Sequence, residues 1–400
     1  MRLVWVNHYA VTPDLPGGTR HVELGRELAR LGWEVSVVST DFHFQERRFR
    51  RRSDAADRRL IEERVAGVRM LWLWSAPYRD NDWRRLWNWV SFARGVLRLR
   101  TPADVVIGSS PHLLAAAAAA RKARRDGARF ILEVRDLWPE SIRAAGGRKG
   151  PVYHALGAIA SWLYRRAERI VVLTRGVGDR LIERGVDPEK IVFAPNGVDV
   201  EAFEHVVGEP RPVVTFGYAG AHGPANGLDC LLDAAELLRD DPSIRIVCVG
   251  DGPLKPVLAA RVREAGLSNV SFEPPVSKAE VPGVMARFDV GLMLLREAEL
   301  FRFGVSPNKL FDYLAAGLPV VSNVGGDVAS MIAAAGAGET VAGGSPSALA
   351  EAIRRMAARA RAERLALGAA GRAWVAANHG RRNVAEHLDV AFRRLVGATA

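Results

Sequence analysis

The sequence of 400 residues contains few cysteines and no long apolar segment. Its two cysteines, Cys230 and Cys248, offer neither a disulfide framework nor the spacing of a metal site, which fits a reducing, cytoplasmic location. No apolar run reaches the roughly 18 residues that a membrane-spanning helix needs, so we expect no such helix. The residues Leu3 to Val6 predict a first strand rather than the core of a signal peptide. No pair of acidic residues occupies a plausible strand end, so we expect neither a metal nor another cofactor.

Positive charge is concentrated in the first half of the chain. The net charge is +11, and residues 1–200 carry 35 Lys and Arg against 23 Asp and Glu, whereas residues 201–400 carry 21 against 22. Between Arg47 and Arg100, this basic excess coincides with five of the ten tryptophans. No motif of a nucleic-acid reader accompanies the charge, so we do not expect nucleic acid as a partner.

One basic segment has the spacing of a helix, with Trp83, Leu86, Trp87, Val90 and Arg94 on one side. The predicted helix has an aromatic and aliphatic face bordered by arginines, and such a helix can lie on an anionic membrane surface. An ordinary helix with a core-facing apolar side and a solvated basic side fits the same pattern. Both interpretations stay open at this point.

The segment from Val305 to Val321 is the most informative about function. Its start, Ser306-Pro307-Asn308, predicts the N-cap and first turn of a helix, whose free N–H groups and positive dipole end can hold a phosphate. Lys309 adds a positive charge about one turn inside, and Asp312 is placed to accept hydrogen bonds from a sugar hydroxyl. An ordinary capped helix before a parallel strand explains the spacing equally well.

This segment resembles the nucleotide-sugar signature of retaining glycosyltransferases of family 4, in the branch that builds bacterial capsular, O-antigen and exopolysaccharide repeat units. The similarity extends from Gly17-Gly18 to the region of Trp374. Most members carry two glutamates that flank the helix. Here Asp312 matches the second glutamate, and the first falls on Gly304, eight residues earlier. The resemblance therefore implies that Asp312 binds the ribose of the donor.

Two glycine-rich turns each follow an apolar strand and precede a helix, one in each half of the chain. In the first half, Gly17 and Gly18 precede a helix that begins at Arg20, and in the second half a loop runs from Gly220 to Gly227. Backbone N–H groups of such turns can approach a diphosphate closely, because glycine has no side chain. A plain tight turn explains Gly17 and Gly18 equally well.

The resemblance implies further donor residues. Relatives carry an arginine and a lysine in the second loop to neutralise the diphosphate, and this chain has neither. The substitutes that we expect are His222, Asn226, Lys309 and Arg302. An ordinary surface histidine is the alternative for His222. The expected donor-binding set is Gly17, Gly18, Gly220, Asn226, Gly250, Val276, Ser306, Pro307, Asn308 and Asp312, with Val276 against the uracil.

A polar cluster follows the predicted strand Phe130 to Leu132 and resembles the family segment that lines the acceptor side. By that resemblance, Asp136 hydrogen-bonds or deprotonates the attacking hydroxyl, while Arg135 and Trp138 shape the acceptor pocket. Asp136, Lys309 and His222 form the expected catalytic set. The alternative is a structural ion pair between Arg135 and Asp136, with Trp138 packed in the core.

The resemblance implies an α/β protein with the GT-B fold, in which two Rossmann-like, doubly wound domains face a central cleft. We expect an acceptor-binding domain over residues 1–200 and a nucleotide-sugar-binding domain over residues 201–374. A turn at Pro195-Asn196-Gly197 precedes the boundary. The last helix, within residues 375–400, is expected to return to the first domain.

The function implied is that of a retaining hexosyltransferase. It would transfer a hexosyl unit, with an N-acetylated amino sugar as one candidate, from a UDP-sugar to a lipid-linked saccharide in cell-surface polysaccharide synthesis. A peripheral position at the anionic inner face of the plasma membrane follows from that acceptor. Two alternatives are a soluble natural-product glycosyltransferase with a small-molecule acceptor and a non-catalytic nucleotide-binding protein.

Overall fold

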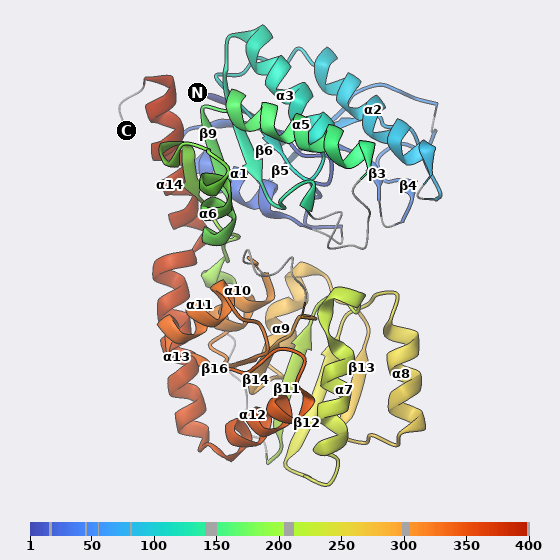
Figure 1. Ribbon diagram of the computed structural model, residues 1–400, viewed down its shortest axis with the longest axis vertical. Helices are drawn as coiled ribbons and strands as arrows, with labels where there is room; N and C mark the ends of the chain where they lie inside the picture. The colour runs from blue at the N-terminus through green and yellow to red at the C-terminus, as the bar shows by residue number, and fades with distance from the viewer. Residues whose placement is uncertain are drawn as a thin grey trace. The chain divides into compact units, whose positions relative to one another are not determined.

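The computed structural model describes residues 1–15, 18–44, 46–54, 56–80, 82–140, 150–203, 212–297, 305–306 and 308–397. The chain divides into two compact α/β units, drawn in Figure 1. Unit 1 comprises Met1–Pro195 and Val384–Ala400, and unit 2 comprises Asn196–Asn383. Among the described residues, no helix has the length and apolarity needed to cross a membrane.

Unit 1 contains an eight-stranded sheet in the order β10-β9-β8-β7-β1-β2-β6-β5. All neighbouring strands are parallel except β5 and β6, which form an antiparallel hairpin. The strands are β1 (Arg2–Val6), β2 (Glu34–Thr40), β5 (Ile61–Val65), β6 (Val68–Leu73), β7 (Val105–Ser109), β8 (Arg129–Val134), β9 (Arg169–Val172) and β10 (Ile191–Phe193). A separate hairpin pairs β3 (Phe42–His43) with β4 (Arg48–Phe49).

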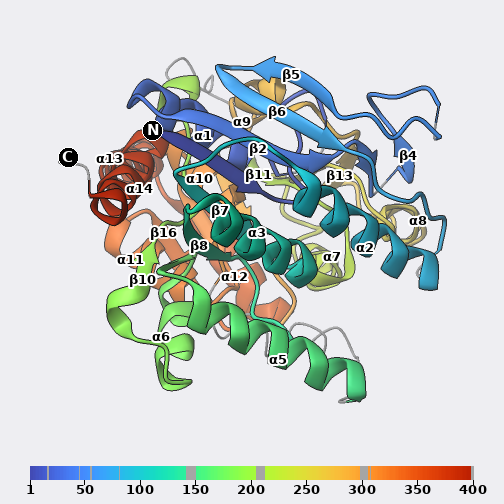
Figure 2. The same cartoon turned by 90° about the horizontal axis from the view of Figure 1, so that it is seen from above.

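Helices cover both faces of this sheet. The helices of unit 1 are α1 (Arg20–Arg30), α2 (Trp83–Arg98), α3 (Leu113–Asp126), α5 (Pro151–Arg166), α6 (Arg175–Glu183) and α14 (Arg381–Val396), with the 3-10 turn η1 (Pro188–Lys190). Apolar residues of α1 and α14 pack with Leu3 and Trp5 in one core cluster. On the other face α2, α3 and α5 lie side by side (Figure 2).

The alanine run in α3 has a packing role. A Cβ on Gly108 of β7 would lie 2.9 Å from the Cα of Ala116, so helix and strand are in backbone contact. Small side chains along Ala115 to Ala120 permit this approach, and all six are buried. The low-complexity segment is therefore a helix–sheet interface.

Unit 2 contains a six-stranded, wholly parallel sheet in the order β13-β12-β11-β14-β15-β16. The strands are β11 (Val214–Ala219), β12 (Ile244–Val249), β13 (Val270–Glu273), β14 (Val290–Met293), β15 (Val320–Ser322) and β16 (Gly338–Thr340). Its helices are α7 (Leu228–Leu237), α8 (Lys255–Glu264), α9 (Val281–Met285), α10 (Asn308–Ala315), α11 (Asp327–Ala335), α12 (Pro346–Ala358) and α13 (Arg361–His379). The 3-10 turns are η2 (Val200–Phe203), η3 (Pro224–Asn226) and η4 (Lys278–Glu280).

The α10 helix is fixed against this sheet by large buried side chains. Leu310, Phe311, Tyr313 and Leu314 are fully buried and belong to one core cluster. A Cβ on Gly291 of β14 would lie 2.5 Å from the Tyr313 ring, so only glycine leaves room for it. The sheet thereby sets the position of the residues that α10 carries.

Both units have the predicted doubly wound, Rossmann-like architecture, because parallel strands alternate with helices on both sheet faces. Two local predictions differ from the structure. The strand predicted at Phe130–Leu132 extends to Val134, which places Glu133 inside it. Lys309 is the second residue of α10 rather than one turn inside. The units divide after Pro195 and after Asn383, where the prediction had limits after residues 200 and 374.

Candidate active site

In unit 1, the predicted residues meet at the carboxyl edge of the sheet. Arg135 and Asp136 follow β8, and their backbone N–H groups donate to the hydroxyl of Ser110, after β7, at 2.9 and 3.3 Å. A Cβ on Gly18 would lie 3.6 Å from Nη2 of Arg135. The structure therefore brings Gly18, Arg135 and Asp136 together, whereas Gly17 lies outside the described residues.

Arg135 and Asp136 do not form the structural ion pair considered from sequence. Within the described part of the chain, no carboxylate lies within ion-pair distance of the Arg135 guanidinium. Asp136 is exposed. Partial desolvation raises its pKa, and the Arg135 charge acts in the opposite direction. An exposed carboxyl group with a raised pKa suits a group that accepts a proton or hydrogen bond from an acceptor hydroxyl.

Trp138 lies two residues further along and is partly buried. Its indole Nε1 is shielded from solvent and has no hydrogen-bond partner within the described ranges. Buried polar groups normally have a partner, so the unpaired N–H is available to a bound molecule. Its acceptor role stays a prediction.

A buried polar cluster that the sequence did not indicate supports this edge. Glu133 accepts hydrogen bonds from Arg20 Nε and His21 Nε2, each at 3.0 Å, and from the Ser109 hydroxyl at 2.6 Å. Arg20 also donates to the carbonyl of Ala194 at 2.7 Å. The cluster thus ties the start of α1 to β8 and to the chain after β10. The pair Arg20-His21, two residues after Gly18, could have pointed to it, since two basic side chains start a helix there.

The charges in this cluster are mutually dependent. Burial alone would raise the pKa of Glu133, but His21 and Arg20 hold it well below its usual value. Burial lowers the pKa of His21, and the carboxylate of Glu133 opposes that shift. Arg20 and His21 of this cluster begin α1 directly behind Gly18 and Thr19, so we assign the cluster a positioning role.

In unit 2, the predicted glycines Gly220 and Gly250 lie where the loop after one strand touches the loop after the next. A Cβ on Gly250, after β12, would lie 1.9 Å from the carbonyl oxygen of Gly220, after β11. Both residues have φ values near +150°, which other residues rarely adopt. The same Cβ would lie 3.3 Å from Nε2 of His222. Gly220, His222 and Gly250 are therefore neighbours.

Lys309 reaches this loop from the start of α10. Its Nζ donates to the hydroxyl of Tyr218 at 3.0 Å and lies 4.3 Å from the ring centroid. A Cβ on Gly220 would lie 3.7 Å from the same Nζ. Burial lowers the pKa of Lys309 to about 7. An amine that is partly protonated at neutral pH thus lies beside the glycine loop.

Two tyrosines hold this loop, and sequence reasoning missed both. The Tyr218 hydroxyl donates to the carbonyl of Ala221 at 2.7 Å, and the Tyr313 hydroxyl accepts the N–H of Ala219 at 2.9 Å. Tyr218 is at the end of β11 and Tyr313 is on α10. Their hydroxyl groups therefore fix the loop relative to the helix that carries Lys309.

His222 is fully buried, and neither ring nitrogen has a hydrogen-bond partner among the residues described. Burial lowers its pKa to about 4, and the charges of Lys255 and Lys309 act in the same direction. The ring is therefore neutral near pH 7, so it can donate a hydrogen bond but supplies no charge. Asn226, in η3, accepts the N–H of Gly223 at 3.3 Å.

Asp312 is buried on α10 and is ion-paired. Both of its carboxylate oxygens accept from Nζ of Lys278 at 2.8 Å. Lys278 begins η4, two residues after the exposed Val276. The structure thus brings the predicted ribose ligand and the loop of the predicted uracil contact to one edge of the sheet. Lys278 itself was missed.

The segment that leads into α10 is held by Asn196, which lies 110 residues earlier in the chain. The Ser306 hydroxyl accepts the N–H of Asn196 at 2.9 Å, and the Ser306 carbonyl accepts from Asn196 Nδ2 at 2.7 Å. Asn308 is exposed and is the first residue of α10. Pro307, together with Arg302 and Gly304, lies outside the described residues.

No metal-ligand cluster was predicted from the sequence. Across the described ranges, no three His, Cys, Asp or Glu side chains gather as metal ligands. Independence of a divalent ion stays a prediction that only activity measurements test.

Comparison with known proteins identifies the family. Residues 17–197 match the family model of the glycosyl transferase 4-like domain, and residues 213–359 match that of glycosyl transferases group 1. A putative colanic acid biosynthesis glycosyl transferase, WcaI of Escherichia coli, is 27% identical over 327 residues, 76% of this chain and 79% of that protein. The 2-deoxystreptamine glucosyltransferase of Streptomyces kanamyceticus is 29% identical over 60% of this chain and 64% of its own.

Solved structures show the same fold. The structure of Anabaena HepE in complex with UDP-glucose aligns with a TM-score of 0.71 at 14% identity, over 98% of this chain and 100% of HepE. The architecture of both units, the two matched domain families and the similar proteins all indicate the same family. The chain belongs to the family 4 glycosyltransferases of the GT-B fold, of the type that takes part in polysaccharide biosynthesis.

Proposed function

We propose that this glycosyltransferase transfers a hexosyl unit, with an N-acetylated amino sugar as one candidate, from a UDP-sugar to a lipid-linked saccharide, with retention at the anomeric carbon. The observation that carries the donor part is the ammonium of Lys309 beside the Gly220 loop, with no carboxylate partner in the described residues. A desolvated cation there favours a departing diphosphate more strongly than the same charge in water. The UDP-glucose complex of HepE supports a UDP-sugar as the donor.

Neighbouring groups of unit 2 are proposed to complete the donor site. The neutral ring of His222 donates a hydrogen bond to a phosphate oxygen, and Lys309 supplies the charge. Asp312, oriented by Lys278, accepts a hydrogen bond from a ribose hydroxyl. Stabilising the leaving diphosphate in this way supports a retaining reaction, in which no strong nucleophile is required.

The carboxyl edge of unit 1 is proposed to serve the acceptor. Asp136 is exposed and unpaired among the described residues, so it can hydrogen-bond to an acceptor hydroxyl. Arg135 lies against Gly18, which places beside a glycine turn a second cation that has no carboxylate partner among the described residues. The N–H of Trp138 adds a donor for a saccharide oxygen.

We also propose a peripheral position at an anionic membrane surface. On α2, Trp83, Leu86 and Trp87 are exposed, so they do not pack in the core as the alternative from sequence required. Exposed tryptophans beside arginines are typical of helices that lie in a membrane interface. The colanic acid relative supports a cell-surface polysaccharide as the product.

The donor part is tested by thermal unfolding with a panel of nucleotide sugars, followed by transfer assays with the one that stabilises most. Lys309→Ala should abolish the stabilisation and reduce turnover by about a hundredfold or more. Lys190→Ala, which removes a lysine from η1 of unit 1, is the matched control and should behave as wild type. Equal stabilisation of wild type and Lys309→Ala would contradict the proposal.

A soluble natural-product glycosyltransferase is the second candidate. The similarity to a 2-deoxystreptamine glucosyltransferase favours it. A small aminocyclitol acceptor that is turned over faster than any lipid-linked saccharide would select this candidate. Donor binding without transfer or hydrolysis would instead select a non-catalytic nucleotide-binding protein.

A further inference from the structure

The outer side of α2 borders a groove of about 510 Å3 in unit 1. The groove lies between α2 and the end of β6, and its lining combines two aromatic rings with four guanidinium groups. We call it the α2 groove and define it by Arg58, Trp74, Trp87, Arg94, Arg98 and Arg100. It belongs to neither the candidate donor site nor the carboxyl edge that carries Asp136.

The four arginines of the α2 groove have no carboxylate partner within the described ranges. Arg58 instead lies over the ring of Trp74, with its guanidinium carbon 4.5 Å from the ring centroid. In the neighbouring hollow, by contrast, Arg2 is paired with Asp104 at 2.7 Å. Four unpaired guanidinium groups around one groove repel one another, and an anion would relieve that repulsion.

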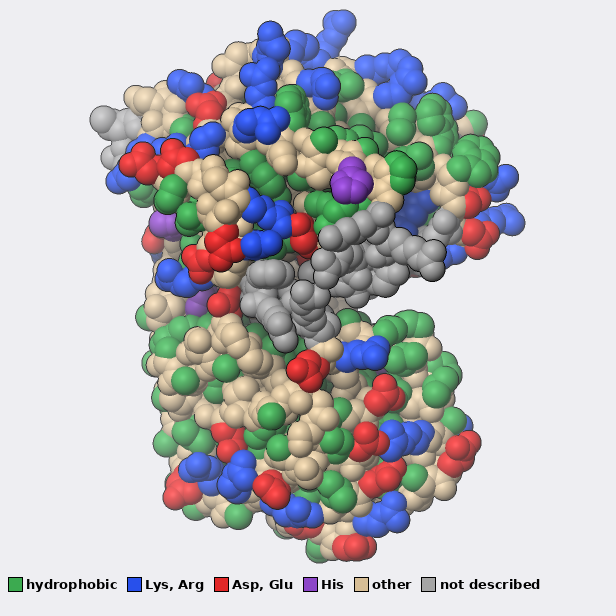
Figure 3. Space-filling view, viewed as in Figure 1, with side chains coloured by type: hydrophobic (Ala, Val, Ile, Leu, Met, Phe, Trp, Pro, Cys, Tyr) green, Lys and Arg blue, Asp and Glu red, His purple; other side chains and the backbone are tan. Residues whose placement is uncertain are grey.

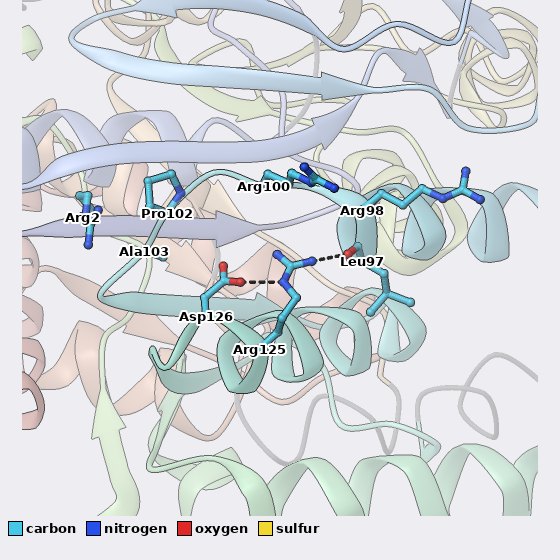
Figure 4. Close-up of a pocket in the computed structure, with 8 residues that line it drawn as sticks. All are labelled: Arg2, Leu97, Arg98, Arg100, Pro102, Ala103, Arg125 and Asp126. Atoms are coloured by element: carbon cyan, nitrogen blue, oxygen red, sulfur yellow. Dashed lines mark hydrogen bonds and ion pairs between the residues drawn. The ribbon is translucent and has the colours of Figure 1, made fainter.

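A second hollow, of about 550 Å3, continues the groove toward the amino edge of the sheet and shares Arg98 and Arg100 with it (Figure 4). In this hollow Arg125 donates to the Leu97 carbonyl and to Asp126. Figure 4 shows no such contact from Arg98 or Arg100. Basic side chains also gather over unit 1 at the top of Figure 3. Arg98 and Arg100 thus border both hollows at the carboxyl end of α2.

Apolar side chains adjoin the charged groove. Trp87 lines it and is 44% exposed. The preceding residue Leu86 is 55% exposed, and Trp83, one turn earlier on α2, is 70% exposed. Large apolar side chains that remain this exposed mark an interaction surface. A ligand that contacts both the arginines of the groove and these apolar side chains would carry a phosphate-like anion together with an apolar part.

We propose that the α2 groove binds the phosphate head group of an anionic membrane lipid, while Trp83, Leu86 and Trp87 enter the adjoining apolar layer. Arg94, Arg98 and Arg100 hold the phosphate, because guanidinium groups form paired hydrogen bonds with it. Trp74, covered by Arg58, forms the wall of the groove. This inference rests on the proposed function, since it names the place where the enzyme meets the membrane that carries its acceptor.

The test is sedimentation of the full chain with vesicles of phosphatidylcholine, alone or mixed with phosphatidylglycerol. Wild type should sediment with the mixed vesicles only. The triple variant Arg94→Gln, Arg98→Gln, Arg100→Gln should bind them about a hundredfold more weakly, because each arginine near an anionic surface contributes a factor of about five. Trp83→Ser with Trp87→Ser should weaken the same binding without changing its preference for phosphatidylglycerol.

The matched control removes the same charge from unit 2 through Arg239→Gln, Arg245→Gln and Arg263→Gln, three exposed arginines on that unit. It should bind vesicles as wild type does. Equal loss in both triple variants would show that net charge alone drives binding and would overturn the assignment. Binding of glycerol phosphate or an oligonucleotide to the groove, without binding to mixed vesicles, would overturn it too. Thermal unfolding of each variant verifies that it folds.

The same samples separate this inference from the proposed function. The α2 groove variant should hydrolyse the UDP-sugar at the wild-type rate, because the groove contains none of the donor residues. Donor turnover by wild type without vesicle binding would reject the groove and leave the proposed transfer reaction standing. Vesicle binding that depends on the groove, in a protein that turns over no nucleotide sugar, would support the groove and reject the proposed transfer reaction.

Discussion

The ammonium nitrogen of Lys309 lies 3.0 Å from the hydroxyl oxygen of Tyr218. These residues are 91 positions apart, one on the first turn of α10 and the other at the end of β11. Within the described part of the chain, no carboxylate neutralises the amine. The hydroxyl group therefore orients Lys309 while leaving its charge available to an anionic ligand.

We expect donor binding to weaken as the pH rises above about 7. The pKa of Lys309 is lowered to about 7 by burial, so the amine loses its proton in this range. A bound diphosphate favours the protonated form, so binding above this pH takes up a proton. Calorimetric titration in buffers of different ionisation enthalpy measures that uptake. Lys309→Arg should bind without this pH dependence, since arginine stays charged.

Tyr218→Phe should reduce kcat/KM by about tenfold to a hundredfold. The change removes the acceptor of the Lys309 hydrogen bond and the donor to the Ala221 carbonyl, and a hydrogen bond to a charged group contributes about 1.5–3 kcal/mol. Because Tyr218 positions Lys309, the pH at which donor binding weakens should also shift. A lower rate with an unchanged pH profile would assign Tyr218 a purely structural role.

Lys278→Ala and Asp312→Asn should each raise KM for the UDP-sugar with a smaller effect on kcat. Lys278 holds both oxygens of the Asp312 carboxylate, so either change disturbs the same predicted ribose contact. The double variant should be little worse than the single ones, because residues in direct contact act as a unit. Steady-state kinetics of the three variants measure these effects. If the increases in KM caused by the two single changes multiply in the double variant, the pair does not act together.

Glu133→Gln should destabilise unit 1 by about 3 kcal/mol, because it removes the charge that partners buried Arg20 and His21. The folded-state pKa of Glu133 is depressed, so its contribution is complete above the ordinary glutamate pKa of about 4.3 and is lost at lower pH. Denaturation at several pH values measures both effects. Glu168→Gln, in an exposed pair with Arg129, should change stability by less than about 1 kcal/mol.

Local patterns predicted a large part of the fold and the chain positions that meet in the candidate donor site. Gly220, Gly250 and Lys309 were found because each stands at the end of an apolar strand or the start of a helix, and such positions are readable from spacing. The doubly wound units followed from alternating strands and helices together with the resemblance. The exposure of Trp83 was open in sequence, because an amphipathic pattern does not say which side of a helix packs on the sheet.

The remaining site residues depend on contacts between distant parts of the chain. Lys278 meets Asp312 across 34 residues, and Arg20 meets Glu133 across 113. Nothing in the local sequence around either cation indicates its partner, since the partner is brought in by the order of the strands. The sequence also could not show that Arg135 and Asp136 form no ion pair, because the side chains of adjacent residues at a strand end can point in different directions.

Turnover of the UDP-sugar in the presence of a chelator tests the central claim most directly. In this account, the ammonium of Lys309 and the His222 ring stabilise the leaving diphosphate. Wild type should therefore release UDP at an undiminished rate in excess EDTA, and Lys309→Ala should be slow with or without it. Turnover that disappears in EDTA and returns with added Mg²⁺ or Mn²⁺ would contradict the account.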